Sequence, residues 1–403
     1  MPTLRALPSD LGYALYGVAR TRAIESRAAA ALPAHALMAR AGRATARLAQ
    51  SLTPHAQRIW IAAGSGNNGG DGLAAAGHLA RAGFDVQVSL LGDADRLPTD
   101  AAQALALARA AGVTVSDALP AEATLRRDDL AIDALLGIGG SRAPRAALAA
   151  AIARLNGWPG VVLAIDVPSG LEADTGRWLG DIAVRAHHTL ALLTLKPGLF
   201  TAAGRDAAGE VWFDDLGVAL DEVPDAWLAA SPAPPARGHA LHKGSFGDVA
   251  VIGGAPGMAG AALLAARAAH AAGAGRVFVQ ELGATALEVD PWRPELMFRP
   301  GLLADTQQAQ RLACVVCGCG GGSTVREVLP QVLSLPARLV LDADALNAIA
   351  DDAALQAILR GRAARGRATV LTPHPLEAAR LLGLTTAQVQ ADRLATAQAL
   401  AQR

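Results

Sequence analysis

The chain has 403 residues, enough for two domains of ordinary size. Its 36 basic residues balance 36 acidic ones without forming a basic stripe, which argues against a nucleic-acid partner. The N-terminus lacks the apolar core of a signal peptide, and the longest uncharged apolar run, residues 249–266, is broken by glycines and a proline. We therefore expect a cytoplasmic protein without a membrane partner.

Short apolar runs alternate with alanine-rich helical patterns along the first half of the chain. A helical region over 21–50 comes first, and the predicted strands that follow it are 58–63, 85–91, 130–135, 161–165 and 189–195. Helices are predicted between them, for example over 72–82 and 99–111. Because these strands are continuous hydrophobic runs, they indicate a parallel sheet covered by helices on both faces.

A proline-rich stretch, residues 231–237, separates this half from a second region with the same rhythm. The predicted strands of that region are 249–252, 276–279, 314–317, 339–341 and 369–371, with a helical segment over 385–402 at the end. We therefore predict two α/β domains, residues 1–230 and 231–403.

Glycine-containing loops with polar residues follow four strands of the first half. These loops are 64–72, 133–140, 166–170 and 196–198. Since the carboxyl ends of parallel strands meet at one edge of a sheet, we expect the loops to form one ligand site there.

The first of these loops matches the pattern G-x-G-x-x-G, which is also typical of a dinucleotide-binding turn with a ribose-binding acid further on. The candidate acid, Asp85, starts its strand and does not end it, which counts against that interpretation. Asn67, Asn68 and Asp71 carry oxygens suited to a cation or to hydroxyl groups. Lys196, one of only two lysines in the chain, follows another of the strands, and a buried ammonium can titrate whereas a guanidinium does not.

The sequences NNGGDG (67–72), DALLG (133–137), DVPSG (166–170) and LKPG (195–198) together resemble the NAD(P)H-hydrate epimerase family. That family has a Rossmann-like three-layer αβα fold and interconverts the R and S forms of hydrated NAD(P)H, written NAD(P)HX. The resemblance implies that Asp166 is the catalytic acid/base and that Lys196 supports it. It implies a potassium ion held by Asn68, Asp133 and Ser169. The implied substrate contacts are Asn67, Asn68, Gly69, Gly70, Asp71, Gly137, Ile138, Gly139, Gly140, Ser141, Arg142, Ala143 and Asp166.

Other readings of these residues stay open at this point. Asp133 and Asp166 are also suited to helix caps or loop braces, and Asn67 and Asn68 to left-handed turns. If these alternatives hold, the first half is a non-catalytic nucleotide-binding or interaction module that kept the fold.

Four motifs of the second half, HKGSFGD (242–248), CGCGGG (317–322), LDADALN (341–347) and LTPHPLEAAR (371–380), resemble the NAD(P)H-hydrate dehydratase family. That family has a ribokinase-like fold. It uses ATP or ADP with Mg²⁺ to phosphorylate the C6 hydroxyl of the S-hydrate, and loss of phosphate restores NAD(P)H. The resemblance implies hydrate contacts at Ala261, Gly320 and His374, with Asp344 and Asn347 near the site. A ribokinase-like small-molecule kinase is the alternative.

The family's Gly-Thr-Gly-Asp loop, which supplies the anion hole for phosphoryl transfer, does not occur after Thr372. We therefore expect the ribokinase-like domain to be truncated and its lyase activity to be impaired. His374 is also suited to a rigid turn, and Asp342 and Asp344 to caps. The three clustered cysteines are predicted to be small buried residues and not a zinc site. We expect a homo-oligomer.

Overall fold

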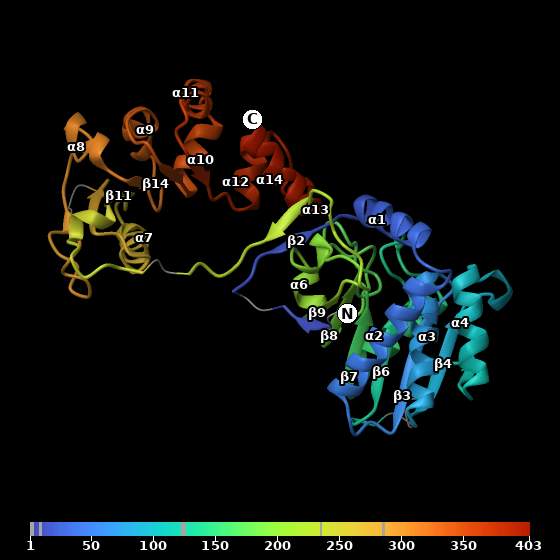
Figure 1. Cartoon of the computed structure of the whole chain (residues 1–403). Coiled ribbons are helices and arrows are strands. Elements are labelled where there is room, and N and C mark those ends of the chain that lie inside the picture. Colours follow the sequence, from blue (N-terminus) through green and yellow to red (C-terminus); the bar gives the residue numbers. More distant parts are fainter. Residues whose placement is uncertain (1–3, 8–9, 122–125, 234–235, 284–286) are drawn as a thin grey trace. The chain divides into compact units, whose positions relative to one another are not determined.

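The computed structural model describes residues 4–7, 10–121, 126–233, 236–283 and 287–403. Its contacts divide the chain into two compact units, Met1–Pro234 and Pro235–Arg403, shown in Figure 1. In the described part of the chain, no helix has both the length and the apolar character needed to cross a membrane.

The first unit is built on an eight-stranded sheet in the order β1-β9-β8-β7-β6-β3-β4-β5. Its strands are β1 (Arg5–Ala6), β3 (Arg58–Gly64), β4 (Asp85–Leu91), β5 (Thr114–Ser116), β6 (Leu130–Ala134), β7 (Val161–Ile165), β8 (His188–Leu192) and β9 (Glu210–Asp214). All neighbours pair in parallel except β1 with β9. The chain runs from β3 outward through β4 and β5 and resumes at β6 on the other side. The strand order therefore reverses between β3 and β6, where ligands bind in sheets of this kind.

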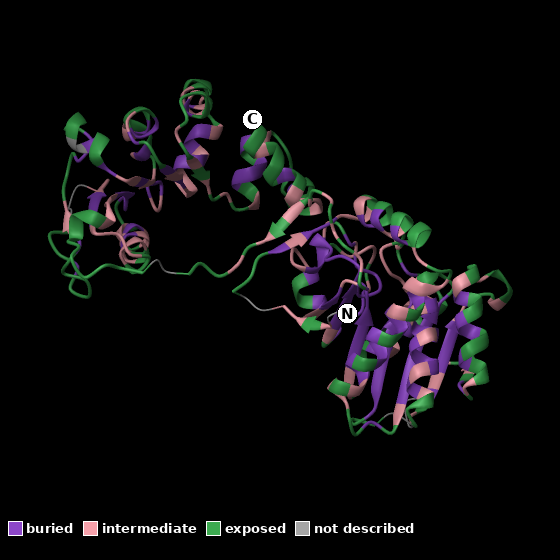
Figure 2. Ribbon diagram, in the orientation of Figure 1, coloured by how far each residue is buried: buried purple, intermediate pink, exposed green. Residues whose placement is uncertain are grey.

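Helices cover both faces of this sheet. Alternate residues of β3 point to opposite faces: Ile59 and Ile61 pack with α2 (Ala36–Leu52), α3 (Asn67–Arg81) and α4 (Thr99–Ala110), whereas Trp60 packs with α5 (Ala147–Asn156). Figure 2 shows the buried strands between these layers. The smaller elements of the unit are β2 (Tyr13–Leu15), α1 (Val18–Ala31), η1 (Ala94–Arg96), η3 (Pro197–Leu199), α6 (Gly204–Ala207) and β10 (Ala226–Leu228).

The second unit is a six-stranded, fully parallel sheet in the order β13-β12-β11-β14-β15-β16. Its strands are β11 (Asp248–Gly253), β12 (Arg276–Glu281), β13 (Met297–Phe298), β14 (Cys314–Cys317), β15 (Leu339–Leu341) and β16 (Thr369–Leu371). Its helices are η4 (Lys243–Phe246), α7 (Ala259–Ala271), α8 (Thr306–Arg311), α9 (Val325–Ser334), α10 (Ala343–Ala350), α11 (Ala353–Ala364), α12 (Pro375–Leu382), α13 (Thr386–Ala391) and α14 (Arg393–Gln402).

Helices also cover both faces of the second sheet. In β11, Val251 packs against α7 on one face, and Ile252 packs with residues of α9 and α10 on the other. The strand order reverses between β11 and β14, so this sheet has its own switch point. The prediction of parallel sheets covered on both faces is confirmed for both units.

Several predicted elements differ at their ends or in their continuity; the helical region predicted over 21–50, for example, is two helices, α1 and α2. The helix predicted over 72–82 already begins at Asn67. The strand predicted over 189–195 ends at Leu192, because Leu193 has the left-handed backbone φ of 65° and leaves the sheet. The segment 385–402 forms two helices, since the side chain of Asp392 accepts from Ala395 N at 2.9 Å and starts α14.

Candidate active site

The helix after β3 begins early because two glycines allow it to approach its neighbours closely. A Cβ on Gly69 would lie 1.8 Å from the carbonyl oxygen of Gly64, and one on Gly70 would lie 2.4 Å from Cε of Met38. Only glycine fits at these two contacts. Asn67 and Asn68 therefore occupy the first turn of α3. Neither has a positive φ, so the left-handed alternative was wrong.

Asp133 and Ser169 form a buried hydrogen-bonded pair between β6 and the loop after β7. The Ser169 hydroxyl donates to Oδ1 of Asp133 at 2.6 Å, and the Ser169 amide donates to Oδ2 at 2.8 Å. Burial raises the pKa of Asp133 to about 6, although the hydrogen bonds from Ser169 and Leu135 lower it. The pair thus joins the ends of two neighbouring strands.

Asp166 follows β7 in a strained conformation and is held by two donors. Its φ is 69°, which is uncommon for a residue other than glycine and is concentrated at functional sites. The Lys196 ammonium donates to Oδ1 of Asp166 and, at 2.7 Å, to the carbonyl oxygen of Leu192. The Ile138 amide donates to Oδ2 at 3.2 Å. The Lys196 side chain is only 1% exposed and that of Asp166 13%, so this ion pair is largely shielded from water.

The carboxylate of Asp166 faces a cavity of about 770 Å³, within the range of small-molecule sites. The cavity lies at the switch point between β3 and β6. The candidate residues on its wall are Asn67, Asn68, Asp71, Gly137, Ile138, Gly139, Gly140, Asp166 and Lys196. The loops after β3, β6, β7 and β8 therefore meet at one cavity.

Asn68 has the polar atoms of a ligand-binding side chain without protein partners. Among the described residues, neither its Oδ1 nor its Nδ2 has a hydrogen-bond partner, although both atoms are buried. Burying such an amide unpaired costs about 1–3 kcal/mol. A Cβ on Gly137 would lie 3.3 Å from Cγ of Asn68 and 3.0 Å from Oδ2 of Asp166, so Asn68 and Asp166 lie close to each other. The oxygens of Asn68, Asp133 and Ser169 are of the kind that hard cations prefer.

Two further carboxyl groups line the cavity, Asp71 from α3 and Glu25 from α1. Burial raises the pKa of Asp71 well above its ordinary value, and the charges of Asp166 and Glu25 raise it further. Burial also raises the pKa of Glu25, with a contribution from Asp166, while Lys196 and Arg22 lower it. Carboxyl groups this close cannot all ionise easily, so the cavity retains protons to higher pH than isolated acids would.

Several candidate residues lie away from the cavity wall. Gly69 and Gly70 make the packing contacts described above, and Asp133 and Ser169 are not among the lining residues. The candidates Ser141, Arg142 and Ala143, which follow Gly140, are not among them either.

The sequence did not single out Glu25, although one signal was present. Glu25 is the only acidic residue between Asp10 and Asp71. A lone carboxyl group in a long alanine- and arginine-rich segment is a rare residue type in its context, as the two lysines are in the whole chain. Its position at the cavity, however, depends on tertiary contacts.

Polar residues at the strand ends of the second sheet have local partners. Thr372 donates to Oδ1 of Asp342 at 2.7 Å, and Gly322 N donates to Oδ2 of Asp344 at 2.9 Å. His374 is the N-cap of α12 and accepts from Glu377 N at 3.3 Å. Each of these side chains thus has a structural contact, but only His374 caps a helix, since Asp342 stands at the N-cap of α10 without a side-chain cap bond.

Ala261 and Gly320 are neighbours at the second switch point. Ala261 lies in the first turn of α7, and a Cβ on Gly320 would lie 3.0 Å from that of Ala261. Asn347 accepts from Arg380. The three cysteines are free, and burial raises the pKa of Cys317 to about 12. Among the described residues, no three His, Cys, Asp or Glu side chains gather in a way that could hold a metal ion.

The fold and the cavity define a doubly wound α/β protein with a ligand site at its first switch point. Residues 34–198 match the family model described as "YjeF-related protein N-terminus", and residues 249–403 match the model for NAD(P)H-hydrate dehydratase. The second match covers the β11–β16 sheet and its helices. The first covers the cavity loops together with α2 and α3.

Curated relatives span both units. The bifunctional NAD(P)H-hydrate repair enzyme of Escherichia coli (strain K12) is 36% identical over 392 residues, which cover 92% of this chain and 72% of that protein. The corresponding enzyme of Coxiella burnetii is 37% identical over 89% of this chain and 73% of its own length. A solved ADP/ATP-dependent NAD(P)H-hydrate dehydratase from Bacillus subtilis, crystallised with ATP and Mg²⁺, is 25% identical over 40% of this chain and 55% of its own, with a TM-score of 0.31. The chain belongs to the family of bifunctional NAD(P)H-hydrate repair enzymes.

Proposed function

We propose that the chain repairs hydrated nicotinamide cofactors, with epimerisation of R- and S-NAD(P)HX in residues 1–230 and, if the second domain is complete, nucleotide-dependent dehydration of S-NAD(P)HX in the domain that begins at residue 231. The observation that carries the epimerase half is the buried Asp166–Lys196 pair facing a cavity at the switch point. Epimerisation at a carbon that bears a hydroxyl needs a proton donor and a proton acceptor within hydrogen-bond reach. Asp166 is the acid/base, and Lys196 holds its carboxylate in place.

Substrate and cation would share the first site. Asn67, Asn68 and Asp71 contact the hydrated ring, and the loop from Gly137 to Ala143 holds the dinucleotide. A potassium ion bound by Asn68, Asp133 and Ser169 would supply positive charge next to this group of carboxylates. The unpaired amide of Asn68 supports that placement.

The epimerase half is tested by measuring the conversion of purified R-hydrate to S-hydrate by chiral chromatography or NMR. We expect the wild-type chain to accelerate it and Asp166→Ala to abolish the acceleration. Asp85→Ala is the matched control, because Asp85 lies at the opposite end of its strand and pairs with Arg58. If the wild type does not exceed the spontaneous rate, the non-catalytic alternative replaces this proposal.

The dehydratase half takes ATP or ADP with Mg²⁺ as phosphoryl donor. Ala261, Gly320 and His374 contact the S-hydrate. The adjacency of Ala261 and Gly320 at the second switch point supports this assignment. The test follows the absorbance of restored NADH from S-NADHX with nucleotide and Mg²⁺. Restoration that requires both supports the proposal, and binding of the hydrate without restoration would contradict it.

Two broader properties belong to the same proposal. The free cysteines fit a reducing compartment such as the cytoplasm, which fractionation of cells would test. A homo-oligomer is expected, and light scattering on the purified chain would measure its mass.

A further inference from the structure

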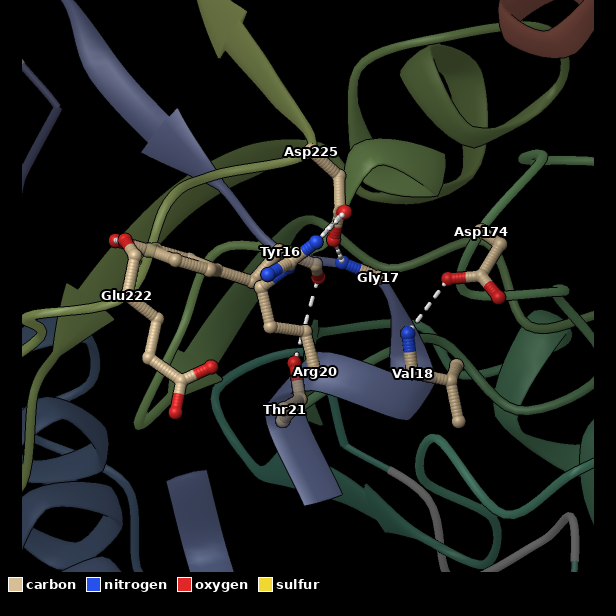
Figure 3. A network of polar contacts seen from close by, with 8 residues as sticks. All are labelled: Tyr16, Gly17, Val18, Arg20, Thr21, Asp174, Glu222 and Asp225. Atoms are coloured by element: carbon tan, nitrogen blue, oxygen red, sulfur yellow. Dashed lines mark hydrogen bonds and ion pairs between the residues drawn. The ribbon is translucent and has the colours of Figure 1, made fainter. Parts of the chain in front are cut away.

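Helix α1 is fixed to the body of the first unit at its N-terminus by two carboxylates, as Figure 3 shows. Gly17 N donates to Oδ2 of Asp225 at 2.9 Å, and Val18 N donates to Oδ1 of Asp174 at 2.7 Å. The Arg20 guanidinium also donates to Asp225, at 2.8 and 3.0 Å. Negative groups at this end of a helix are stabilised by its free amides and its dipole. The direction of α1 is therefore fixed by segments far away in the sequence.

A third contact ties α1 to the segment that carries Lys196. The hydroxyls of Thr21 and Thr194 lie 2.8 Å apart in a buried hydrogen bond. Thr194 is two residues before Lys196, and Glu25 is four residues after Thr21. Because residues four apart share one face of a helix, the contact that holds Thr21 also directs Glu25 toward this side of the cavity.

Glu25 lies on the cavity wall together with the charged groups of the candidate site. Its pKa is raised first by burial and then by the negative charge of Asp166, whereas Lys196 and Arg22 lower it. Asp71, the other acid of the wall, feels the charge of Glu25 in turn. The geometry therefore places a second carboxyl group within electrostatic range of the Asp166–Lys196 pair.

We propose that Glu25 is the second proton-transferring residue of the epimerase reaction and works opposite Asp166; this rests on the proposed function of the first unit. In the R-to-S direction, Glu25 gives a proton to the ring hydroxyl. The C–O bond breaks, water leaves, and the ring nitrogen lone pair forms a C=N⁺ bond. Water then adds to the other face of that carbon and gives its proton to Asp166. A proton returns from Asp166 to Glu25 through solvent, so the cycle needs no oxidant or reductant.

Glu25 suits this role better than Asp71 does. Burial and the carboxylates of Asp166, Glu25 and Asp100 raise the pKa of Asp71, and Lys196 alone lowers it. A strongly raised pKa suits a carboxyl group that donates a hydrogen bond better than one that cycles protons, since the best catalytic pKa lies near the working pH. The pKa of Glu25 is raised as well, but two cations, Lys196 and Arg22, oppose the rise.

The test compares the full chain with Glu25→Gln in the R-hydrate assay across pH. We expect kcat to fall by about 10²–10⁴-fold, with KM nearly unchanged, because proton transfer is lost while the amide keeps the size of the side chain. A reaction that needs one protonated and one ionised group loses activity at both low and high pH, and in the wild type the loss at high pH should come from deprotonation of Glu25. The variant should lose the high-pH limb.

Glu222→Gln is the matched control, because Glu222 accepts from Arg27 of α1 but does not line the cavity. It should behave as the wild type does. If Glu25→Gln retains the wild-type kcat and both pH limbs, the role of Glu25 is overturned, although the wild-type acceleration still supports the epimerase function. Should Glu25→Gln not fold, as judged by circular dichroism, Glu25→Asp is measured instead. Glu25→Asp should be slower than the wild type but should still lose activity at both low and high pH. Loss of activity at only one end of the pH range would refute the proposal.

Discussion

The two sheets of this chain share one topological plan. In each, the chain leaves a central strand to one side and resumes on the other, at β3 and β6 in the first unit and at β11 and β14 in the second. Glycines allow close backbone contacts at both switch points: a Cβ on Gly64 would lie 2.0 Å from the carbonyl oxygen of Leu135, and one on Gly253 would lie 2.3 Å from that of Cys319. Backbone topology alone therefore prepares two equivalent places for a ligand.

The side chains at the two places differ in how fully they are paired. In the first unit, Asn68 lacks a partner among the described residues, Asp166 is strained and Lys196 is buried as an ion. In the second unit, Asp344 and His374 are engaged in local hydrogen bonds, although Oε1 of Glu281 is unpaired among the described residues and Ala343 has a φ of 45°. Since unpaired and strained groups destabilise a fold, they are retained where a ligand uses them. What distinguishes the first site is that its unpaired amide, its strained acid and its buried ammonium all lie on the wall of one cavity.

The largest effect is expected when the chain's two lysines are exchanged for methionine one at a time. Lys196→Met leaves the Asp166 carboxylate without its ammonium, and breaking such a buried pair destabilises proteins by about 3–5 kcal/mol. Epimerisation should be lost as well. Lys243 is exposed, so Lys243→Met should change stability by at most about 0.5 kcal/mol. Urea unfolding followed by tryptophan fluorescence measures both. Equal losses for the two variants would break the comparison.

A potassium ion should stabilise the first unit selectively. At a concentration about 100 times its Kd, a ligand of the folded state adds about 2.7 kcal/mol to the free energy of unfolding. We expect KCl to raise the urea midpoint above that in tetramethylammonium chloride of equal ionic strength. Asn68→Ala should remove the difference. Asn347→Ala, the matched change in the second unit, should preserve it, because Asn347 already pairs with Arg380. A midpoint indifferent to the cation would exclude the potassium site.

Much of this arrangement follows from the sequence, and the misses have physical causes. The strand over Val161–Ile165 was predicted with its correct ends, because a buried parallel strand is a continuous apolar run between polar residues. The convergence of four polar loops also followed, since parallel strand ends share an edge. The turn at Leu193 and the early start of α3 did not follow. Both depend on close tertiary contacts that overrule local preference.

The position of Glu25 shows the same limit for the site itself. Its residue type and isolation are visible in the sequence, but α1 is directed by Asp174 and Asp225, which lie more than 140 residues further along the chain. A pattern of local spacing carries no information on such contacts. Groups that follow strands are predictable from sequence, whereas a group delivered by a separate helix requires the fold.

In the second unit, His374→Ala tests whether that residue has a structural role. Its ring caps α12 by accepting from Glu377 N, and loss of an N-cap typically costs about 1 kcal/mol. Faster amide hydrogen exchange is expected in residues 375–382, without any change in epimerisation. His239→Ala, at an exposed position, is the control. If the exchange rates stay the same while binding of the S-hydrate is lost, the main role of His374 is to contact the ligand. The second unit would then also hold a polar side chain that serves a ligand more than the fold.

The smallest effect concerns Asp71, and it appears only in the dependence of stability on pH. Its pKa is raised above the ordinary 3.8 in the folded state, so between the two values the folded chain binds more protons than the unfolded chain. Stability is therefore lost as pH rises from 3.8 through the raised pKa. Asp71→Asn has no proton to lose. The urea midpoint of the variant should therefore rise relative to that of the wild type as pH increases through this window. At neutral pH it should remain higher than that of the wild type.

Tryptophan fluorescence is suited to this measurement, because five of the six tryptophans lie within residues 1–230. The matched control is Asp85→Asn, since Asp85 is exposed at the opposite end of the sheet. The difference in urea midpoint between Asp85→Asn and the wild type should not change with pH in the way it does for Asp71→Asn. Epimerisation by Asp71→Asn should largely persist, because an amide still donates a hydrogen bond as the neutral acid does. If the variant loses stability at neutral pH, then Asp71 is ionised and paired in the folded chain. The first site would then resemble the second, where Asp342, Asp344 and His374 accept hydrogen bonds.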